Sequence, residues 1–387
     1  MSNSTFLEKK AFNLEVIKEL AREQLPRPIY DYAAGGAGDE CALQQNELHF
    51  KNLSILPRPL DGAGNRDLSV NIFGHPIRFP LIIGPTGLSG LFWPNGELEV
   101  ARAARSRGVG FCLSHASVCT IEDLASVDIV PRWMQVFIYK DRGFTREFCE
   151  RAHAANYDAL VLTVDNQIPG KRERDLRNGF TIPPNFGLTT YVSMFEKYRW
   201  LWRMRRELKN ITFGNYAKIS DTDDFSTLAK RMVSLLDPHM TWEDVIWLRR
   251  IWKRPLILKG ILHPDDALKA LEVGVDGIVV SNHGGRQLDC SAPPILMLGE
   301  IVAKVDQRMA VFLDGGIRRG TDIFKALALG ADACLIGRPQ LWGLAIGGQI
   351  GVEKVLDIFY EEIDLAMGLS GASSIADISK DLIFMDK

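Results

Sequence analysis

Short apolar runs recur along most of the chain, and each ends abruptly in polar residues or glycine. Between most neighbouring runs lies one stretch with helical spacing, such as residues 97–107 or 266–273. Runs this short and this uniformly apolar are typical of strands that are buried on both faces of a parallel sheet. There are eight of them, at residues 81–84, 111–114, 133–137, 160–165, 256–259, 278–281, 311–314 and 334–337.

Strands that alternate with helices indicate βαβ units around a parallel sheet. Eight such units between residues 81 and 337 predict an α/β protein with a closed (β/α)₈ TIM barrel. A doubly wound sheet is the alternative, but it more often carries a Gly-x-Gly-x-x-Gly turn after its first strand. Pro85-Thr86-Gly87 is not that turn. We expect one domain over residues 1–387, with the barrel at about 81–350.

The residues before the barrel predict an N-terminal helical extension. Leu14, Ile17, Leu20 and Ala21 recur at helical spacing, and the prolines that follow end this helix. A second helix is expected from residue 29 until the glycine pair at 35–36.

A long insertion separates the fourth strand from the fifth, at about residues 180–240. A gap of this length in a compact fold is usually functional or mobile. Residues 191–210 hold six basic and two acidic side chains, a local net charge of +4, with tryptophan and tyrosine interleaved. This mixture predicts a segment that lies on an anionic membrane surface. The alternative is an active-site lid or a subunit contact with extended Arg and Lys stems.

Composition narrows the class of protein without identifying it. The chain is 46% hydrophobic and 24% charged, which fits a soluble globular protein with an ample core. A net charge of −2 gives no overall attraction to nucleic acid. The six cysteines show no Cys-x-x-Cys spacing, so we expect a reduced cytoplasmic protein without disulfides or a zinc site. Residues 1–10 do not form a signal peptide, and no apolar run is long enough to span a bilayer.

The polar residues at the strand ends are the candidates for chemistry, because a TIM barrel builds its site there. His283 and Arg286 follow the sixth strand and offer a proton acceptor beside a carboxylate-binding group. The loops after the last two strands, with Asp314-Gly315-Gly316 and Gly337-Arg338, predict a phosphate site. Lys259 could form a Schiff base or neutralise a bound ring. No acidic cluster suggests a metal site.

Two motifs carry a resemblance to a known family. Ser281-Asn282-His283-Gly284-Gly285-Arg286-Gln287-Leu288-Asp289, together with Leu313-Asp314-Gly315-Gly316-Ile317-Arg318-Arg319-Gly320, resembles the FMN-dependent 2-hydroxy-acid dehydrogenases and oxidases. The resemblance runs from about residue 12 to residue 369, and its motifs are highly specific. Further stretches, such as Pro85-Thr86-Gly87-Leu88, are most similar to the membrane-associated (S)-mandelate dehydrogenases.

The resemblance implies FMN as cofactor and a role for each matching position. His283 would take a proton from the substrate, Asp165 would stabilise its imidazolium form, and Lys259 would lie by the flavin N1 edge. Around the substrate, Arg286 and Arg172 would bind the carboxylate and Tyr32 would donate a hydrogen bond. The remaining cofactor-binding positions would be Pro85, Thr86, Gly87, Ser114, Gln135, Thr163, Ser281, Asp314, Gly315, Gly316, Arg318, Gly337 and Arg338.

Three positions bear on the substrate. Ala116 and Gly87 match the mandelate type and leave room for a bulky side group, whereas Phe137 replaces a tyrosine that the family pattern carries. The resemblance therefore implies oxidation of an (S)-2-hydroxy acid with a bulky aromatic side chain, with electrons passed to a membrane quinone or a similar acceptor. It also implies a homotetramer at the inner face of the membrane. The alternatives are a soluble oxidase that uses O₂, an L-lactate dehydrogenase, a Schiff-base lyase and a non-catalytic flavin-binding protein.

Overall fold

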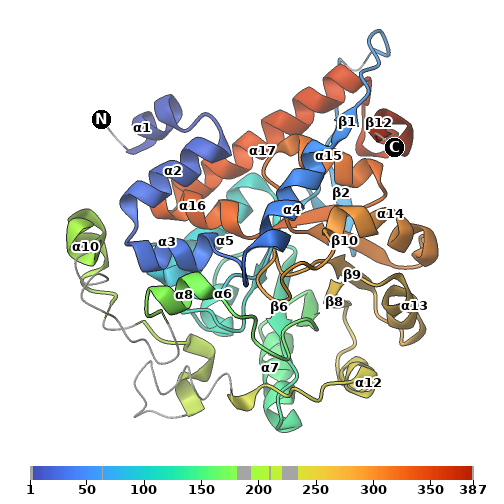
Figure 1. The fold of residues 1–387 in the computed structure, drawn as a ribbon. Coiled ribbons are helices and arrows are strands. Elements are labelled where there is room, and N and C mark those ends of the chain that lie inside the picture. The colour runs from blue at the N-terminus through green and yellow to red at the C-terminus, as the bar shows by residue number, and fades with distance from the viewer. Residues whose placement is uncertain (1–2, 63, 181–192, 209–210, 220–233, 386–387) are drawn as a thin grey trace.

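The computed structural model describes residues 3–62, 64–180, 193–208, 211–219 and 234–385. Eight parallel strands close into a barrel in the order β10-β11-β4-β5-β6-β7-β8-β9, which confirms the predicted TIM barrel (Figure 1). All but the ends of β10 and one residue of β8 are buried, because helices cover the outside and side chains fill the inside. The strands are β4 (Leu81–Ile83), β5 (Gly110–Leu113), β6 (Arg132–Val136), β7 (Ala159–Thr163), β8 (Leu256–Ile261), β9 (Gly277–Val280), β10 (Ala310–Asp314) and β11 (Ala333–Ile336).

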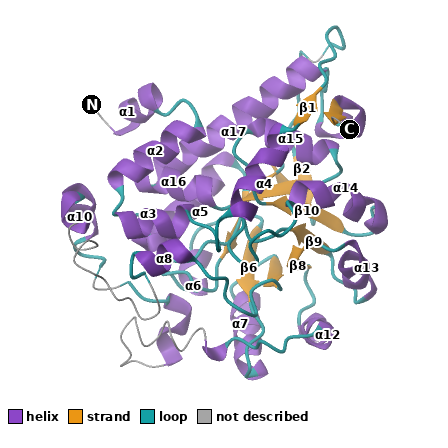
Figure 2. Ribbon diagram, viewed as in Figure 1, coloured by secondary structure: helices purple, strands orange, loops and turns teal. Residues whose placement is uncertain are grey.

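A ring of helices surrounds these strands (Figure 2). Their apolar faces pack on the outer face of the barrel in one continuous core, which is the layered arrangement expected of βαβ units. The helices are α5 (Gly96–Arg107), α6 (Ile121–Ala125), α7 (Arg142–Ala154), α12 (Trp242–Ile251), α13 (Pro264–Glu272), α14 (Pro294–Val305), α15 (Gly320–Ala328), α16 (Arg338–Gly347) and α17 (Gln349–Ser370).

A second core fills the barrel interior. The hairpin of β2 (Val70–Ile72) and β3 (His75–Ile77) contributes to it, and the Phe73 ring at the turn lies 6.2 Å from Trp133 and 6.0 Å from Phe312. The hairpin therefore closes the amino end of the barrel. A site that opens to the surface is therefore expected at the opposite end, where the carboxyl ends of the strands meet.

The N-terminal extension is helical, as predicted. It consists of α1 (Asn3–Lys10), α2 (Leu14–Gln24), α3 (Arg27–Ala34) and α4 (Cys41–Lys51). Pro28 does not stay outside the second predicted helix but lies in the first turn of α3, where its missing N–H has no intrahelical partner to lose. After α4, β1 (Leu53–Ile55) pairs antiparallel with β12 (Ile383–Met385). The segment that follows the N-terminal helices therefore lies beside the last described strand.

Short elements complete the structure. The insertion after β7 contains α8 (Glu173–Arg177), α10 (Tyr198–Met204) and the 3₁₀ helix η2 (Gly214–Ile219); the other 3₁₀ turns are η1 (Ser89–Leu91), η3 (Ile375–Asp377) and η4 (Lys380–Leu382). Parts of the insertion predicted at about 180–240, and both ends of the segment 191–210, lie outside the described residues. Within the described ranges, no helix is both long and apolar enough to cross a membrane.

Strand β8 contains a bulge that the other barrel strands lack in their described pairings. Its register against β9 shifts between Lys259 and Ile261, and Gly260 at the shift has φ of +110°. A Cβ at Gly260 would lie 2.5 Å from Asp165 Cγ. Glycine is therefore required twice here, by the backbone conformation and by the carboxyl group packed against it.

We expect Gly260→Ala to lower the free energy of unfolding by more than the cost of placing alanine at a positive φ. Gly274→Ala is the matched control, because Gly274 has φ of +78° and nothing within 4 Å of the added Cβ. The control should cost about 1–2 kcal/mol. Gly260→Ala should cost roughly 1–3 kcal/mol more, because Asp165 must move as well. Urea unfolding followed by circular dichroism measures both, and equal losses would contradict the crowding at Asp165.

Candidate active site

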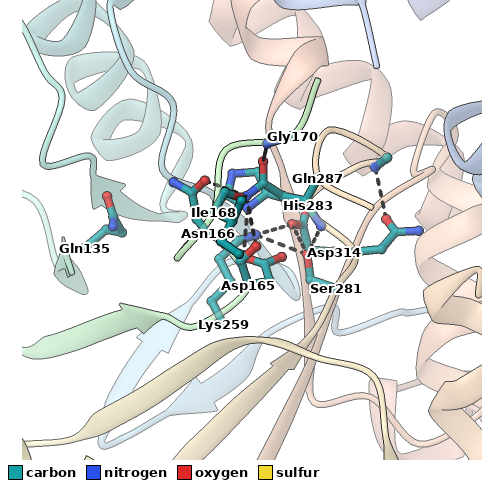
Figure 3. Close-up of polar contacts among 12 residues, drawn as sticks. Gln135, Asp165, Asn166, Ile168, Gly170, Lys259, Ser281, His283, Gln287 and Asp314 are labelled. Atoms are coloured by element: carbon teal, nitrogen blue, oxygen red, sulfur yellow. Dashed lines mark hydrogen bonds and ion pairs between the residues drawn. The ribbon is translucent and has the colours of Figure 1, made fainter. Parts of the chain in front are cut away.

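Charged and polar side chains meet at the carboxyl ends of β7 to β10 (Figure 3). Lys259 Nζ on β8 lies 2.6 Å from Asp314 Oδ2 at the end of β10 and donates to Ser281 Oγ at 3.1 Å. Ser281 Oγ in turn donates to Asp314 Oδ2 at 2.8 Å. The ammonium group, the hydroxyl and the carboxylate thus form a closed triangle at the rim of the barrel.

His283 is held at the edge of this triangle. It has a left-handed backbone conformation with φ of 58°, and its N–H donates to Ser281 Oγ at 3.0 Å. Its ring Nδ1 lies 2.9 Å from Asp165 Oδ1. Because an ionised carboxylate only accepts hydrogen bonds, Nδ1 carries the proton of the neutral ring and Nε2 carries the lone pair. Nε2 is therefore the nitrogen that can accept a proton from a bound molecule.

Burial and neighbouring charges set the protonation of these groups. Burial lowers the pKa of His283, Asp165 partly offsets this, and Lys259 and Arg172 lower it further. The imidazole is therefore neutral near pH 7. Burial alone would lower the pKa of Lys259, but Asp314 and Asp165 outweigh burial and raise it. Lys259 is consequently a stable cation, and Lys259 in turn lowers the pKa of Asp314 against the opposing effect of burial.

This charge state decides between the two roles considered for Lys259. A Schiff-base lysine must lose its proton to attack a carbonyl carbon, and it does so when burial or a neighbouring cation lowers its pKa. Lys259 shows the opposite shift and has a carboxylate 2.6 Å away. The geometry favours electrostatic neutralisation of a bound ring over a lyase mechanism.

Two arginines lie together beside this group. Arg286 Nη1 donates to the backbone oxygens of Tyr32 at 2.7 Å and Gly35 at 3.1 Å, and its guanidinium lies over the Tyr32 ring at 5.2 Å. Arg172 Nε is buried without a partner among the described residues. The charge of Arg286, followed by burial, lowers the pKa of Arg172 to about 10. Two guanidinium groups that repel each other and have no carboxylate partner among the described residues favour an anion between them.

Two small residues lie beside Tyr32, whose ring contacts Arg286. A Cβ on Gly87 would lie 3.1 Å from Ala116 Cβ and 3.5 Å from Tyr32 Oη, so these three residues meet at one place. Tyr32 Oη also donates to the Gly87 carbonyl at 3.3 Å. Phe137 is 5% exposed and packs edge-on against the His115 ring, with centroids 4.2 Å apart. Phe137 is therefore joined to this pocket through the residue that precedes Ala116.

His115 was not among the residues predicted for the site. Its backbone N–H and ring Nδ1 both lie within hydrogen-bond distance of Gln135 Oε1, at 3.0 and 2.8 Å. An amide oxygen only accepts, so Nδ1 carries the proton and Nε2 is an acceptor. Burial lowers the pKa of His115 to about 4, which keeps the ring neutral. His115 therefore cannot replace the hydroxyl donor that Phe137 lacks. Its place directly after the second apolar run, next to Ser114, was the signal that the sequence offered.

The loops expected to hold a phosphate are built around glycine and arginine. Gly315 and Gly316 have φ of 107° and 85°, and a Cβ on Gly316 would overlap the Asn46 carbonyl. Gly337 caps α16, and Arg338 in its first turn donates to the carbonyls of Ala33 at 3.0 Å and Gly35 at 2.9 Å. Burial, followed by the charges of Arg286 and Arg318, lowers the pKa of Arg338 well below its usual value.

These residues fit a dianionic phosphate group. Arg338 donates only to carbonyls among the contacts in the described residues, so its charge is not neutralised by a carboxylate there. A helix N-terminus and glycine N–H groups supply further donors. Arg318 points elsewhere, since its Nη2 lies 2.9 Å from Glu47 Oε1. Both arginines line a cavity of about 1040 Å³ between the N-terminal helices and α8.

The positions expected around a flavin ring lie at four neighbouring strand ends. Ser114 and Thr163 are buried, and Ser114 Oγ accepts from the Ala116 N–H at 3.2 Å. Pro85 and Thr86 follow β4, and Gln340 Nε2 donates to Thr86 Oγ1 at 2.7 Å. Gln135 stands apart from the His283 group in Figure 3, across the barrel mouth.

Three further polar residues were missed by the sequence reasoning. The side-chain amides of Asn46 on α4 and Asn282 exchange hydrogen bonds, both of 2.8 Å, and both residues are buried. Gln340 is fully buried, and its Oε1 has no partner among the described residues. Neither asparagine was predicted, because single amide residues have no spacing that would single them out.

The arrangement combines a proton acceptor, a carboxylate-binding pair of arginines, a fixed ammonium and a phosphate-binding loop. Together they fit a phosphorylated redox cofactor beside an anionic substrate. The chain matches the family described as FMN-dependent dehydrogenase over residues 21–385.

Individual relatives support the match. L-lactate oxidase of Nostoc sp. is 43% identical over 377 residues, covering 96% of this chain and 98% of the relative. The 2-hydroxyacid oxidase 1 of Homo sapiens is 40% identical over 364 residues, covering 94% of each chain. The solved structure of the monotopic membrane protein (S)-mandelate dehydrogenase superposes with a TM-score of 0.93 at 38% identity, covering 97% of this chain and 99% of that one.

Proposed function

The chain belongs to the family of FMN-dependent dehydrogenases and oxidises 2-hydroxy acids, and from that premise we propose a mandelate-like substrate. The substrate would be an (S)-2-hydroxy acid with a bulky aromatic side group, and the product the 2-keto acid. The observation that carries the site assignment is the neutral His283, fixed by Asp165, beside two arginines that have no carboxylate partner in the described part of the chain.

His283 is the base in this proposal. Its Nε2 accepts a proton from the substrate, and the imidazolium that forms is stabilised by Asp165 Oδ1, 2.9 Å from Nδ1. Asp165 Oδ2 is buried without a partner among the described residues, so the carboxylate keeps unused capacity to accept. The lowered pKa of His283 keeps the base unprotonated at neutral pH.

Arg172 and Arg286 orient the substrate. A carboxylate placed between them relieves the repulsion that lowers the pKa of Arg172 and gains charge-assisted hydrogen bonds. Tyr32, whose ring lies under Arg286, would add a hydroxyl contact on the same side. Binding by three fixed groups holds the reacting carbon near His283 and excludes water from it.

FMN, when bound, supplies the acceptor for the two electrons that leave the substrate. Lys259, held as a cation by Asp314, would neutralise negative charge on its ring, with Ser281 beside it. Thr86, Ser114, Gln135 and Thr163 would hold the ring and ribityl groups. The loops with Gly315, Gly316, Gly337 and Arg338 would hold the phosphate end, with Asp314 at the ribityl chain. Arg318, also expected there, is paired with Glu47 and would have to leave that carboxylate to contribute.

The proposed acceptor is a membrane quinone, and support for it comes from α10. Tyr198 and Trp202 on this helix are 65% and 68% exposed, and Phe195, which precedes it, is 75% exposed. Trp200 and Met204 anchor the other face of the helix: both are buried, and Trp200 Nε1 donates to the Leu91 carbonyl at 3.0 Å.

The helix lies at the outer edge of the molecule in Figure 1, away from the strands. Arg199 and Arg205 are exposed beside the aromatic rings, with Arg205 4.2 Å from the Trp202 ring centre. Exposed aromatic rings interleaved with arginine suit the interface of an anionic membrane. In this proposal the protein is a homotetramer bound peripherally at the inner face of the membrane.

A second candidate function has its own support. The relatives include oxidases of lactate and of other 2-hydroxy acids, so a soluble oxidase that uses O₂, or an L-lactate dehydrogenase, is the alternative. The two differ in the preferred side group and in the acceptor. Ranking hydroxy acids by anaerobic bleaching of the flavin, followed by adding O₂ or a quinone, separates them.

The first prediction concerns the base. His283→Ala should retain FMN and lose about 10²–10⁴-fold in flavin reduction, measured by anaerobic stopped flow. In the unmodified enzyme, kcat/KM should fall on the acid side below pH 6.5, because burial lowers the pKa of His283. Asp165→Asn should shift this acid-side fall in kcat/KM to still lower pH, because the Asp165 carboxylate raises the pKa of His283. The same substitution should slow flavin reduction. Asp265→Asn, at an exposed carboxylate paired with Lys304, is the control. If the pH dependence of kcat/KM is unchanged in Asp165→Asn, Asp165 does not set the protonation of His283.

The second prediction concerns the pocket. Mandelate-like acids should be turned over well and glycolate hardly at all, because the small residues Gly87 and Ala116, which meet Tyr32, would take up little of the volume that a bulky side group needs. Ala116→Trp should reverse the order by filling that space. Phe137→Tyr should raise kcat/KM by up to about tenfold through one added hydrogen bond, without changing the preference. If the unmodified enzyme prefers glycolate or lactate to every bulky acid, this account of the pocket is wrong. That result would favour the soluble oxidase or the L-lactate dehydrogenase.

The third prediction concerns α10. The protein should float with vesicles of phosphatidylglycerol and phosphatidylcholine at low salt and be released as salt screens the contact, each basic residue contributing about 1 kcal/mol. Phe195→Ser with Trp202→Ser should abolish flotation and keep the turnover of a soluble acceptor dye. Leu365→Ser, which removes a 60% exposed apolar side chain from α17, is the control. If the intact protein ignores the vesicles, the lid or subunit-contact interpretation is correct.

A further inference from the structure

Two cysteines far apart in the sequence meet on the surface of the fold. Cys41 is the first residue of α4, and Cys290 follows the loop that carries His283 and Arg286. The two thiol sulfurs and a carboxylate oxygen of Asp289 all lie within 4.8 Å of one another. Cys290 is exposed and Cys41 is partly exposed, so small reagents can reach the pair.

The pair lies at the contact between the catalytic loop and the N-terminal extension. On this contact the Ala37 N–H donates to the Gly285 carbonyl at 2.8 Å, and Arg286 Nη1 donates to the Tyr32 and Gly35 carbonyls. A Cβ on Gly285 would lie 2.5 Å from the backbone nitrogen of Leu43. The two segments are therefore packed backbone to backbone, and a bond between them would act directly on the loop of His283 and Arg286.

The carboxylate beside the thiols is already used. Asp289 Oδ1 accepts from the N–H groups of Ala42 and Cys290, each at 2.9 Å, and Oδ2 accepts from the Asp39 N–H at 2.9 Å. These bonds satisfy the amino end of α4. Only two thiols then remain free to act as ligands, fewer than the three or four that a zinc site uses. The geometry favours bond formation between the sulfurs over metal binding.

The remaining cysteines offer no second pair of this kind. Cys112, Cys149 and Cys334 are buried, and burial raises the pKa of Cys149 to about 12. Cys119 is partly exposed, but burial of its thiol raises its pKa strongly. Contact with Cys290 raises the pKa of Cys41, and Cys290 is the more exposed of the two thiols, so Cys290 is the one that meets a reagent first.

We propose that Cys41 and Cys290 are a redox-active pair that closes to a disulfide and thereby changes the substrate site. Hydrogen peroxide is the oxidant. The Cys290 thiolate attacks it to form a sulfenic acid and releases hydroxide, which takes up the thiol proton as water. The Cys41 thiol then attacks the Cys290 sulfur, the S–S bond forms, and a second water leaves. The pair loses two electrons and two protons, and a dithiol reverses the change.

The disulfide would link the two segments covalently. It holds its sulfurs about 2.05 Å apart, so forming the bond fixes the start of α4 against the loop after β9. The hydrogen bonds of Asp289 hold it to α4, so any displacement falls on residues 284–288, which include Arg286. Given the proposed function, the oxidised enzyme should keep FMN and show a higher KM for the hydroxy acid.

The chemical test uses the full-length, FMN-loaded protein. It is treated with hydrogen peroxide, blocked with N-ethylmaleimide, unfolded and digested, and its peptides are identified by mass spectrometry. We expect two of the six thiols to become unavailable and one peptide to link residues 41 and 290. Cys41→Ser and Cys290→Ser should abolish the link, whereas Cys119→Ser should keep it. This readout does not depend on the identity of the substrate.

The kinetic test compares reduced and oxidised enzyme. KM should rise several-fold on oxidation and return with dithiothreitol, and Cys290→Ser should not respond. Three outcomes overturn the proposal: sulfinic acid on Cys290 without a link to Cys41, tight retention of Zn²⁺ by the reduced pair, or a linked enzyme whose KM is unchanged. Failure of the hydroxy-acid assay with a link still formed would instead contradict the proposed function alone.

Discussion

The ion pair between Lys259 and Asp314 is the interaction on which the site depends. At 2.6 Å, with both groups enclosed at the barrel mouth, it offsets the cost of removing two charges from water and keeps Lys259 protonated. Ser281 joins the pair and also receives the His283 N–H, so the position of the base follows from the same contact. The bulge at Gly260 leaves room for Asp165, which completes the orientation of His283. Without the pair, a buried cation and a buried carboxylate would each lack a partner beside the reacting groups.

The second constraint on the site is that it holds more positive side chains than carboxylates to pair with them. Arg172, Arg286 and Arg338 add three guanidinium groups around this pair and donate to carbonyls or to no described partner. The lowered pKa values of Arg172 and Arg338 show that this arrangement is unfavourable for the protein alone. In the proposed function a phosphate and a substrate carboxylate would remove this penalty, so that the energy of binding two anions is used where the reaction needs it. Burial, together with the charges of Lys259 and Arg172, lowers the pKa of His283 and keeps the base ready to accept a proton.

The N-terminal extension forms part of the site and does not only cover the outside of the barrel. Tyr32 and the carbonyls of residues 32–35 receive the arginines, Asn46 pairs with Asn282, and Asp289 caps α4. Apart from the contact of Arg338 on α16, these contacts join the extension to the loop after β9. A chemical change at this contact, such as the disulfide between Cys41 and Cys290, would therefore reach His283 and Arg286 without touching either. On another side of the molecule, α10 uses Trp200 and Met204 to attach to the body and leaves Tyr198 and Trp202 exposed.

The sequence by itself determined the eight strands, the barrel they form and the strand-end positions of His283, Lys259 and Asp314. Buried parallel strands leave local apolar runs, and a closed barrel brings their carboxyl ends to one rim whatever the loops do. The resemblance added FMN and a role for each residue. Only the tertiary structure decided which charges pair, because a contact such as Lys259 with Asp314 joins residues 55 positions apart and leaves no periodic signal. The bulge at Gly260, the amide pair of Asn46 and Asn282, and the buried face of α10 were hidden for the same reason: each depends on which distant segment packs against it, and local spacing does not record that.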